Sequence, residues 1–422
     1  MFQIVQKYFL NLKTTYYSFP KKFWLVVAVS FIDRVGGTLL FPFFALYITS
    51  HFDVGMTEAG SVLGLFSVFG MVGGVLGGAL TDRMGRKSLI LFGLVFSAVS
   101  TLTLGFVDNF SLLIPLAVLI GSLSNIAGPA HSAMIADILP EEQRQEGFGI
   151  LRVIANMAWL IGPTVGGFFA SRDFFILFVA DALISLLVAI LFFLFIPETQ
   201  SEHLREQHEK SGTTILESIA GYVSVTKDKA FMAFILASMV AGIVYGQMYS
   251  TLSVYLRDEH GMGPQVYGYL MSISAVVVIL LQFSTSHIIR NKPPFLMLSL
   301  GSLFYMLGFS TFGIFDTFWL FAFNIIIITI GEMINMPTMS VLTAKFAPEE
   351  FRGRYMAVFE LTWAIPGAIG PGLAGLIIDG ANPDLLWYIG GGLCVLSAVM
   401  YYGLHLKLGS QQRFVLNSES AS

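Results

Sequence analysis

The sequence predicts an all-α membrane protein with twelve transmembrane helices, arranged as two pseudo-symmetric six-helix bundles. Three observations support this prediction: the low content of charged residues, the placement of Lys and Arg, and an internal repeat. Of the 422 residues, 55% are hydrophobic and 12% are charged, whereas a soluble domain has about 25% charged residues. A transmembrane helix needs about 20 mostly apolar residues. Twelve such stretches follow one another along the chain: 23–50, 58–80, 88–107, 110–137, 146–171, 174–196, 230–256, 265–289, 294–314, 317–344, 354–378 and 385–407.

The positions of Lys and Arg predict how these spans are oriented. Cytoplasmic loops of membrane proteins carry an excess of Lys and Arg. With the N-terminus in the cytoplasm, 19 of the 23 Lys and Arg residues fall on the cytoplasmic side. Only Arg172 and Arg257 fall outside, while Arg34 and Arg152 lie within spans. We therefore expect a multi-pass protein of the cell (inner) membrane with both termini in the cytoplasm.

A polar segment divides the chain into two groups of six spans. Residues 198–229 are rich in Glu, His, Lys and Arg and form the expected cytoplasmic linker. The linker separates an N-terminal bundle, 23–197, from a C-terminal bundle, 230–407. A cytoplasmic N-terminal segment, 1–22, and a cytoplasmic tail, 408–422, complete the expected organisation.

The two halves repeat each other with a constant offset of 208 positions. Prolines, acids and arginines align as well as apolar residues, so shared apolar composition does not explain the match. Six-helix repeats of the same orientation are related by an axis along the membrane normal. The matched residues are Pro129, Ser132, Ala136, Pro140, Glu141, Glu142, Arg144, Ile161, Gly162, Pro163 and Gly167, which recur as Pro337, Ser340, Ala344, Pro348, Glu349, Glu350, Arg352, Ile369, Gly370, Pro371 and Gly375.

The loop after the second span carries a motif of glycines and charges. Its sequence, GGALTDRMGRK at 77–87, resembles the signature loop of the major facilitator superfamily, and the six-plus-six repeat agrees with that resemblance. Over roughly residues 22–407 the chain is similar to the drug:proton antiporter group, including MdtH-like multidrug proteins. The resemblance implies that Asp82 caps the eleventh helix, which begins near Gly353, because a helix N-terminus favours an anion.

The resemblance also implies that this loop is a conformational switch. Such a latch forms in the outward-open state and must break before the cytoplasmic side opens. The matching loop of the second half, 290–294, is degenerate, so we expect the latch on one side only. A basic loop that serves only to orient the helices is the alternative. The expected members of the switch are Asp82, Arg83, Gly85, Arg86 and, at the inner end of span four, Asp137.

Span five contains a glycine–proline motif, GPTVGG at 162–167, which resembles a motif associated with antiporters in this superfamily. Proline removes a backbone donor and can kink the helix, while the glycines allow close packing. The motif recurs in span eleven, so a symmetric packing role and a role specific to export both stay open. The residues of this helix-packing motif are Gly162, Pro163, Gly166, Gly167, Gly370 and Pro371.

Ionisable side chains within spans are the candidates for proton coupling and substrate binding, because each costs about 2.5–3.5 kcal/mol at the bilayer centre. The drug-antiporter pattern has an arginine in the middle of span four, but 116–125 contains no basic residue here. Asp33 lies about 15 Å into span one, and Arg34 beside it points about 100° away. Glu332 lies near the middle of span ten.

The resemblance implies that spans one, four, seven and ten line a central cavity, with Asp33 and Glu332 in its wall from opposite halves. Apolar surroundings favour the neutral form of a carboxyl group. We therefore expect either acid to take up a proton from outside and release it inside, with a cationic or polar substrate bound to the deprotonated form. A structural ion pair is the alternative for each acid.

Span four adds Asn125 and His131 to this cavity group. The imidazole of histidine has an unperturbed pKa of about 6.5, which suits a proton path, and a hydrogen-bonded packing role is the alternative. Further side chains expected to reach the cavity are aromatic residues, methionines and amides: Phe41, Phe44, Tyr245, Gln247, Met248, Tyr249, Met333, Asn335 and Met336.

Arg152 and Glu360 occupy the same position in the two repeats and carry opposite charges. Their equal depth, in the inner half of spans five and eleven, suits a cytoplasmic gate that closes in the outward-open state. Two unrelated local salt bridges are the alternative, since equivalence in a repeat does not require proximity.

These features predict a secondary active transporter that exchanges protons for hydrophobic or amphipathic compounds, with the lipid bilayer as its setting. A narrow facilitator for one metabolite, such as a sugar, lipid or siderophore, is the alternative in the same class. We find no HExxH, GxSxG or Walker motif and only one cysteine, Cys394, so we expect no enzyme, cofactor or cysteine-based metal site. The net charge of −4 gives no reason to expect nucleic acid. We expect a monomer.

Overall fold

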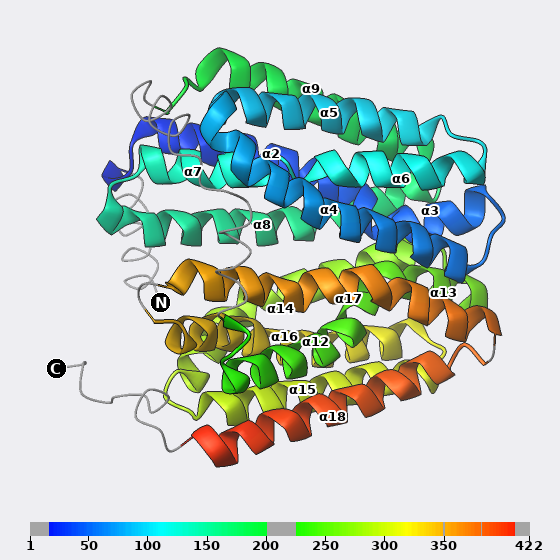
Figure 1. Ribbon diagram of the computed structural model, residues 1–422. Helices are drawn as coiled ribbons and strands as arrows, with labels where there is room; N and C mark the ends of the chain where they lie inside the picture. The colour runs from blue at the N-terminus through cyan, green and yellow to red at the C-terminus, as the bar shows by residue number, and fades with distance from the viewer. Residues whose placement is uncertain (1–16, 201–224, 349–350, 381, 410–422) are drawn as a thin grey trace, which may run out of the picture.

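The computed structural model describes residues 17–200, 225–348, 351–380 and 382–409. The described residues contain twelve helical segments long and apolar enough to cross a membrane, and they form no strand. All twelve run in alternating directions across the molecule (Figure 1). The fold class expected from the sequence is confirmed.

The first six spans are built from eight α-helices and one short 3-10 helix. The first span is bent, and a short 3-10 turn, η1, joins its two helices. The fourth span consists of two helices. In order the elements are α2 (Lys21–Leu40), η1 (Phe41–Phe43), α3 (Phe44–His51), α4 (Met56–Met84), α5 (Arg86–Gly105), α6 (Phe110–Ser124), α7 (Gly128–Ile138), α8 (Glu141–Ala170) and α9 (Phe175–Phe195).

The last six spans follow the same plan. The seventh span, expected as one helix over 230–256, is broken at Thr251. The elements are α12 (Lys229–Ser250), α13 (Leu252–His260), α14 (Pro264–Ile289), α15 (Pro294–Ser310), η2 (Thr311–Gly313), α16 (Phe318–Phe346), α17 (Arg352–Gly380) and α18 (Leu385–Leu408).

Prolines lie at the breaks in spans one and four and favour them, although Pro337, the equivalent of Pro129, lies inside the unbroken helix α16. Proline has no backbone N–H and therefore cannot donate to the carbonyl four residues earlier. Pro42 lies in the η1 turn between α2 and α3. Pro129 lies in the first turn of α7, four residues after Asn125, where α6 ends.

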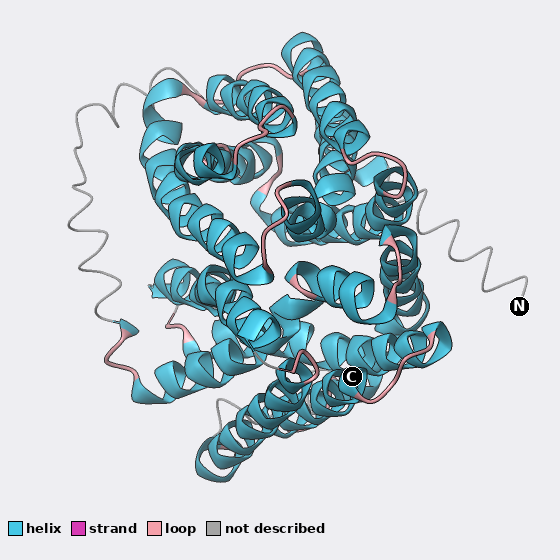
Figure 2. Cartoon of the chain, turned by 90° about the vertical axis from the view of Figure 1, so that its right-hand side faces the viewer, coloured by secondary structure: helices cyan, strands magenta, loops and turns pink. Residues whose placement is uncertain are grey.

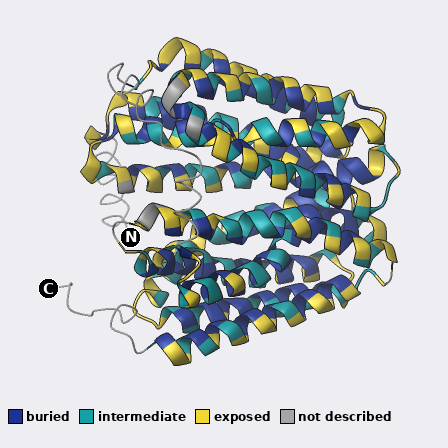
Figure 3. Ribbon diagram, viewed as in Figure 1, coloured by how far each residue is buried: buried dark blue, intermediate teal, exposed yellow. Residues whose placement is uncertain are grey.

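The outer surface of the helices is apolar. Phe283 and Trp319 are each 78% exposed, and many other large apolar residues of the spans are exposed as well. Figure 3 shows exposed positions along most of the helices. A water-soluble monomer does not expose so much apolar surface. A lipid bilayer is the setting that this surface requires.

Two helix pairs join the bundles. Helix α4 packs on α17, and α8 packs on α14. In Figure 2 the view runs along the helices, and the two groups of spans lie on opposite sides of this contact. We call the end that holds Lys21 and Leu408 the terminal end, and the opposite end, which holds the loop before Met56, the far end (Figure 1).

Glycines let these pairs approach closely in their far halves. A side chain at Gly60 of α4 would collide with the backbone of Pro371 in α17. A side chain at Gly268 of α14 would lie 2.5 Å from the carbonyl oxygen of Pro163 in α8. The offset of 208 relates Gly60 to Gly268 and Pro163 to Pro371, so one contact is made twice.

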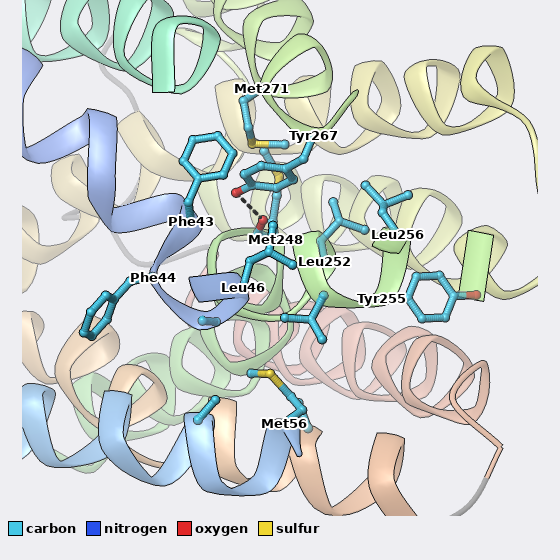
Figure 4. Close-up of a cluster of buried hydrophobic side chains, with 14 of the residues drawn as sticks. Phe43, Phe44, Leu46, Met56, Met248, Leu252, Tyr255, Leu256, Tyr267 and Met271 are labelled. Atoms are coloured by element: carbon cyan, nitrogen blue, oxygen red, sulfur yellow. Dashed lines mark hydrogen bonds between the residues drawn. The ribbon is translucent and has the colours of Figure 1, made fainter. Parts of the chain in front are cut away.

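Buried side chains from both bundles complete the closure of the far end. Phe43 packs edge to face on Tyr267, with ring centroids 5.4 Å apart. The Tyr267 hydroxyl donates to the Met248 carbonyl at 3.0 Å (Figure 4). Leu46 of the first bundle and Leu252 of the second belong to the same buried cluster. At the far end, buried side chains of both bundles therefore form one continuous hydrophobic core.

Replacing the interfacial glycine with valine should destabilise this core. Gly60→Val forces two backbones apart, and overpacking of this kind costs about 1–3 kcal/mol. We expect a lower thermal midpoint in detergent for Gly60→Val than for Gly392→Val, a matched change in α18 where the added side chain meets nothing within 4 Å. Equal midpoints for the two variants would contradict the close approach of α4 and α17.

Candidate functional site

A cavity of about 610 Å³ lies between the two bundles. One wall comes from α8, and the other comes from α12, α14, α16 and α17. Its size falls in the range of about 300–1,000 Å³ that accommodates drug-sized ligands. The lining combines apolar residues with a set of polar and aromatic ones: Arg152, Asn156, Trp159, Tyr245, Tyr249, Gln282, Glu332 and Trp363.

The cavity ends where the bundles meet. On α8, the lining residues from Gly149 to Trp159 precede Gly167, which contacts the start of α14. Trp159 also packs on Tyr249 of the second bundle, with ring centroids 4.8 Å apart. On α14, Gln282 and the other lining residues lie beyond Gly268 toward the terminal end. The cavity therefore faces the terminal end and is closed toward the far end.

Glu332 lies in the cavity wall at the midpoint of the 29-residue helix α16. The preceding residue, Gly331, packs against the Gly301 carbonyl of α15. Since successive helical residues point about 100° apart, close packing at Gly331 leaves Glu332 directed away from α15. Tyr245 and Tyr249, one turn apart on α12, share a hydrogen bond of 3.0 Å. The Tyr245 hydroxyl is within hydrogen-bonding reach of Glu332.

Arg152 faces the same cavity from the first bundle. Its side chain is exposed, and within the described ranges it has no acidic partner within 4.0 Å. Glu332 is the acid close enough to interact with it electrostatically. The cavity thus carries one cation and one acid on opposite bundles.

The expected pairing of Arg152 with Glu360 is not present. Glu360 is exposed on α17 and does not line the cavity. The reason lies in the pseudo-symmetry: α8 faces α14, whereas its equivalent, α17, faces α4. Equivalent residues on these two helices are therefore held at opposite edges of the contact between the bundles, and Arg152 faces Glu332 instead.

Asp33 does not line this cavity, unlike Glu332. One turn after Asp33, Gly36 lies against the Asp181 carboxylate of α9, so this face of α2 is turned into its own bundle. Asp33 and Asp181 interact electrostatically. Asp181 also accepts a hydrogen bond of 2.9 Å from Thr101.

Tyr245, Met248, Tyr249 and Met336 line the cavity as expected, whereas His131, Asn125 and Arg34 lie elsewhere. His131 of α7 is hydrogen-bonded to Ser30 of α2 at 2.7 Å, which is the packing contact that the sequence left open. Asn125 lies at the break of span four, next to Gly74 of α4. Arg34 is exposed outside the lining of the cavity.

The loop motif forms a charge cluster at the terminal end. Gly85 has φ 89°, a conformation that glycine adopts readily. Arg86 pairs with Asp137, with Nε and Oδ2 2.8 Å apart, and Thr199 donates to the same carboxylate oxygen at 3.1 Å. The side chains of Asp82 and Arg83 lie outside the described part of the structure.

Glu198 is a member of this cluster that the sequence analysis missed. Its carboxylate accepts from the backbone N–H of Arg86 at 3.2 Å and of Lys87 at 3.0 Å. An anion is favoured there because these groups begin α5. In the sequence, the one indication of this cap is that Glu198 directly follows span six. We interpreted Glu198 only as part of the polar linker.

The glycine–proline motif packs α8 against two helices. Gly162 lies against Thr38, and Gly166 lies against Leu39, both in α2. Gly167 lies against Pro264 of α14, in the other bundle. In span eleven, Gly370 approaches the Gln247 side chain of α12. The motif therefore fixes α8 within its bundle and at the contact between bundles.

A second pair of equivalent contacts joins the bundles at the far end. The Asp379 carboxylate of α17 accepts from the backbone N–H groups of Met56 and Thr57, at 3.0 and 2.7 Å, and so caps α4. At the equivalent place, Gln265 of α14 donates to Ser171 after α8 at 2.8 Å. The offset of 208 relates Thr57 to Gln265 and Ser171 to Asp379. One contact is charged and the other is neutral.

Near the pseudo-symmetry axis, Arg257 donates to Thr49 at 3.0 Å and also to Ser50. Thr49 and Arg257 are themselves equivalent positions, 208 residues apart, and equivalent residues touch only near the axis that relates them. In the described part of the chain, no group of three or more His, Cys, Asp or Glu residues is placed to hold a metal ion.

Two repeats of six helices around an interfacial cavity define a transport fold of the membrane. The family model for the Major Facilitator Superfamily matches residues 26–371 and 295–415. The chain belongs to the major facilitator superfamily.

Curated relatives and solved structures agree with this assignment. A Na(+), Li(+), K(+)/H(+) antiporter of Planococcus maritimus is 27% identical over 359 residues, which cover 79% of this chain and 84% of the relative. The multidrug resistance protein MdtH of Shigella flexneri is 25% identical, over 84% and 86% of the two chains. A POT family transporter, solved in complex with 5-aminolevulinic acid, shares the fold with TM-score 0.77 and 17% identity, over 92% of this chain and 96% of that one.

Removing the charged cap at the far end should favour separation of the bundles there. Asp379→Ala deletes a carboxylate that accepts two hydrogen bonds, and hydrogen bonds to charged groups contribute about 1.5–3 kcal/mol each. We expect the population with a separated far end to rise about tenfold or more. Spin labels at the exposed loop residues Asp53 and Asp316, one on each bundle, would report this change as longer distances.

The matched control is Ser171→Ala, which removes the neutral contact at the equivalent position. It should change the distance distribution less than Asp379→Ala does. The native Cys394 is buried and should not take up label. An unchanged distribution in Asp379→Ala would show that the cap does not hold the far end closed.

Proposed function

We propose that the protein is a proton-coupled secondary active transporter that exports hydrophobic or amphipathic compounds by alternating access. The observation that carries the proposal is Glu332, an acid at the middle of a transmembrane helix, in the wall of a cavity between the two bundles. An intramembrane acid is costly unless it binds protons or ligands. The printed names of two relatives, an antiporter and a multidrug resistance protein, support the same function.

In this proposal the terminal end is cytoplasmic. The excess of Lys and Arg in the loops of that end supports this orientation, which is that of an inner-membrane protein with both termini in the cytoplasm. The cavity then faces the cytoplasm, so the structure corresponds to an inward-facing state ready to load cargo for export. A single chain supplies both cavity walls, which suits a monomer.

Glu332 exchanges a proton for substrate in the proposed cycle. In the inward-facing state it releases its proton, and the carboxylate then binds a cationic or polar group of the substrate. In the outward-facing state a proton displaces the substrate. Tyr245 and Tyr249 lie beside the carboxylate and offer hydroxyl groups that can exchange hydrogen-bond partners when the proton moves.

Asp33 is the second acid in the proposal, and it acts from within the first bundle. Asp33 and Arg34 of α2, His131 of α7 and Asn125 between α6 and α7 all lie outside the cavity of this state. Asp33 lies on the face of α2 that is turned towards Asp181 and its own bundle. It can therefore take part in proton exchange with the cavity only if α2 rotates during the cycle. Glu332 is therefore the principal candidate.

The charge cluster at the terminal end acts in the proposal as the conformational switch. Arg86 and Asp137 hold the loop to span four, and Asp82 and Arg83 would meet the start of α17 when the terminal end closes. Arg152 and Glu360 lie in the halves of α8 and α17 that must then approach. The Gly162–Gly167 motif and its repeat at Gly370 and Pro371 keep the far end closed while cargo enters.

Neutralising Glu332 should uncouple proton movement from transport. In proteoliposomes with an imposed pH gradient, the wild type should show substrate-dependent proton flux with several members of a panel of amphipathic compounds, Na⁺ and K⁺. Glu332→Gln should reduce that flux at least about tenfold, and Asp33→Asn should reduce it less. Glu259→Gln, at an exposed site near the end of α13 and outside the cavity, is the matched control and should keep most of the flux.

Two outcomes would contradict the proposal. Full flux in Glu332→Gln would remove Glu332 from the coupling mechanism. A response to one compound of the panel alone would favour a narrow facilitator, and a response to Na⁺ or K⁺ alone would favour a cation antiporter.

A further inference from the structure

We propose that the preferred ligand of the cavity is a dipolar molecule of zero net charge: a cationic group that binds Glu332, an anionic group that binds Arg152, and an aromatic or apolar body between them. The inference rests on the proposed transport function and names the substrate class of the same site. It starts from the two charged side chains of the cavity wall.

Arg152 and Glu332 are the two charged residues among those that line the cavity, and they belong to opposite bundles. They interact electrostatically, but no ion pair within 4.0 Å joins them. Each charge therefore lies next to a space of ligand size without a direct partner of opposite sign among the described residues. A ligand group of opposite sign can form a charge-assisted hydrogen bond with each of them.

The charge balance favours ligands that bring both partners at once. The two side chains together contribute zero net charge. A purely cationic ligand satisfies Glu332 but leaves Arg152 unpaired and makes the cavity positive. A purely anionic ligand leaves Glu332 unpaired and makes the cavity negative. A zwitterion satisfies both groups and keeps the cavity neutral.

Aromatic rings line the cavity together with Arg152 and Glu332. Trp159 and Tyr249 pack edge to face at 4.8 Å, and Tyr245 packs on Trp363 at 6.1 Å. Aromatic faces bind both apolar groups and ammonium groups, the latter by cation–π attraction. The Arg152 guanidinium can hold a carboxylate with two parallel hydrogen bonds. The walls thus suit an aromatic body with an ammonium at one end and a carboxylate at the other.

This arrangement also explains how a proton would release such a ligand. A proton on Glu332 cancels the pole that holds the ammonium group. The Arg152 charge then repels that ammonium group. Arg152 still attracts the ligand carboxylate, but this one interaction is weaker than binding at both Arg152 and Glu332. Proton uptake is therefore coupled most strongly to ligands that carry a cationic group, whichever anionic group accompanies it.

The test compares three probes with one aromatic body: an aminomethyl-biphenyl carboxylic acid, its methyl ester and its N-acetyl derivative. They carry both charges, the cation alone and the anion alone. Binding to the full-length protein in lipid nanodiscs is measured by calorimetry without a proton gradient. We expect the wild type to bind the zwitterion at least about tenfold more tightly than either derivative.

Two variants test which side chain binds which charged group of the ligand. Arg152→Gln should reduce affinity for the zwitterion to about that for the ester, and it should not weaken ester binding, because it removes the positive charge that repels the ammonium group. Glu332→Gln should reduce affinity for the zwitterion to that for the N-acetyl derivative. Glu259→Gln, at an exposed site of α13 outside the cavity, should change none of the three affinities.

The inference is overturned if the ester binds the wild type as tightly as the zwitterion, if none of the three probes binds, or if Arg152→Gln weakens zwitterion and ester equally. The wild-type comparison needs no variant, so misfolding of a mutant cannot obscure it. Failure of the proposed function looks different: zwitterion binding follows the expected order while proteoliposomes show no ligand-dependent proton flux. Proton flux driven by the ester as strongly as by the zwitterion would refute the substrate class and leave the transport function standing.

Discussion

The close approach of α4 to α17 and of α8 to α14 is the constraint on which the rest of the structure depends. Glycines at Gly60 and Gly268 bring backbones into contact across the two bundles, and in a bilayer such close packing is a main source of helix association. Both contacts lie in the halves of their helices that are closer to the far end. The halves closer to the terminal end are therefore free to diverge. The cavity is the space left by that divergence.

The cavity in turn determines which buried charges can meet a ligand. Arg152 and Glu332 face it because α8 and α16 border the divergent region. Asp33 is equally deep in its span, but its face of α2 is packed against α9. Depth in the membrane is therefore a poor guide to function by itself, because the rotation of the helix about its axis decides what each side chain meets.

The fold was predictable from the sequence because its determinants are local or periodic. The lengths of the apolar stretches predict the membrane spans. The constant offset of 208 positions predicts which residues of the two halves are equivalent. The breaks of spans one and four are favoured by Pro42 and Pro129, although we expected unbroken spans there. The glycine–proline motif was recognisable as a packing element, but its partners, Thr38 and Pro264, were not.

The candidate site was only partly predictable, since it depends on which helices become neighbours. Glu332 was selected as a lone acid at the centre of a span. That Arg152 faces Glu332 in this structure could not be predicted, because the repeat reveals equivalence and not contact. Asp379 and Glu198, which cap α4 and α5, carry no sequence signal beyond an acid at a span end. Such caps become visible only when the neighbouring helix N-terminus is placed.

The central claim is that Glu332 exchanges its proton for substrate, and proton release on binding tests it most directly. The purified protein in weakly buffered detergent solution with a pH indicator, mixed with a compound that drives proton flux, should release protons on binding in the wild type. Glu332→Gln should bind the compound more weakly and, at saturating concentration, release no proton from this site. Equal proton release by the two proteins at saturation would contradict the account.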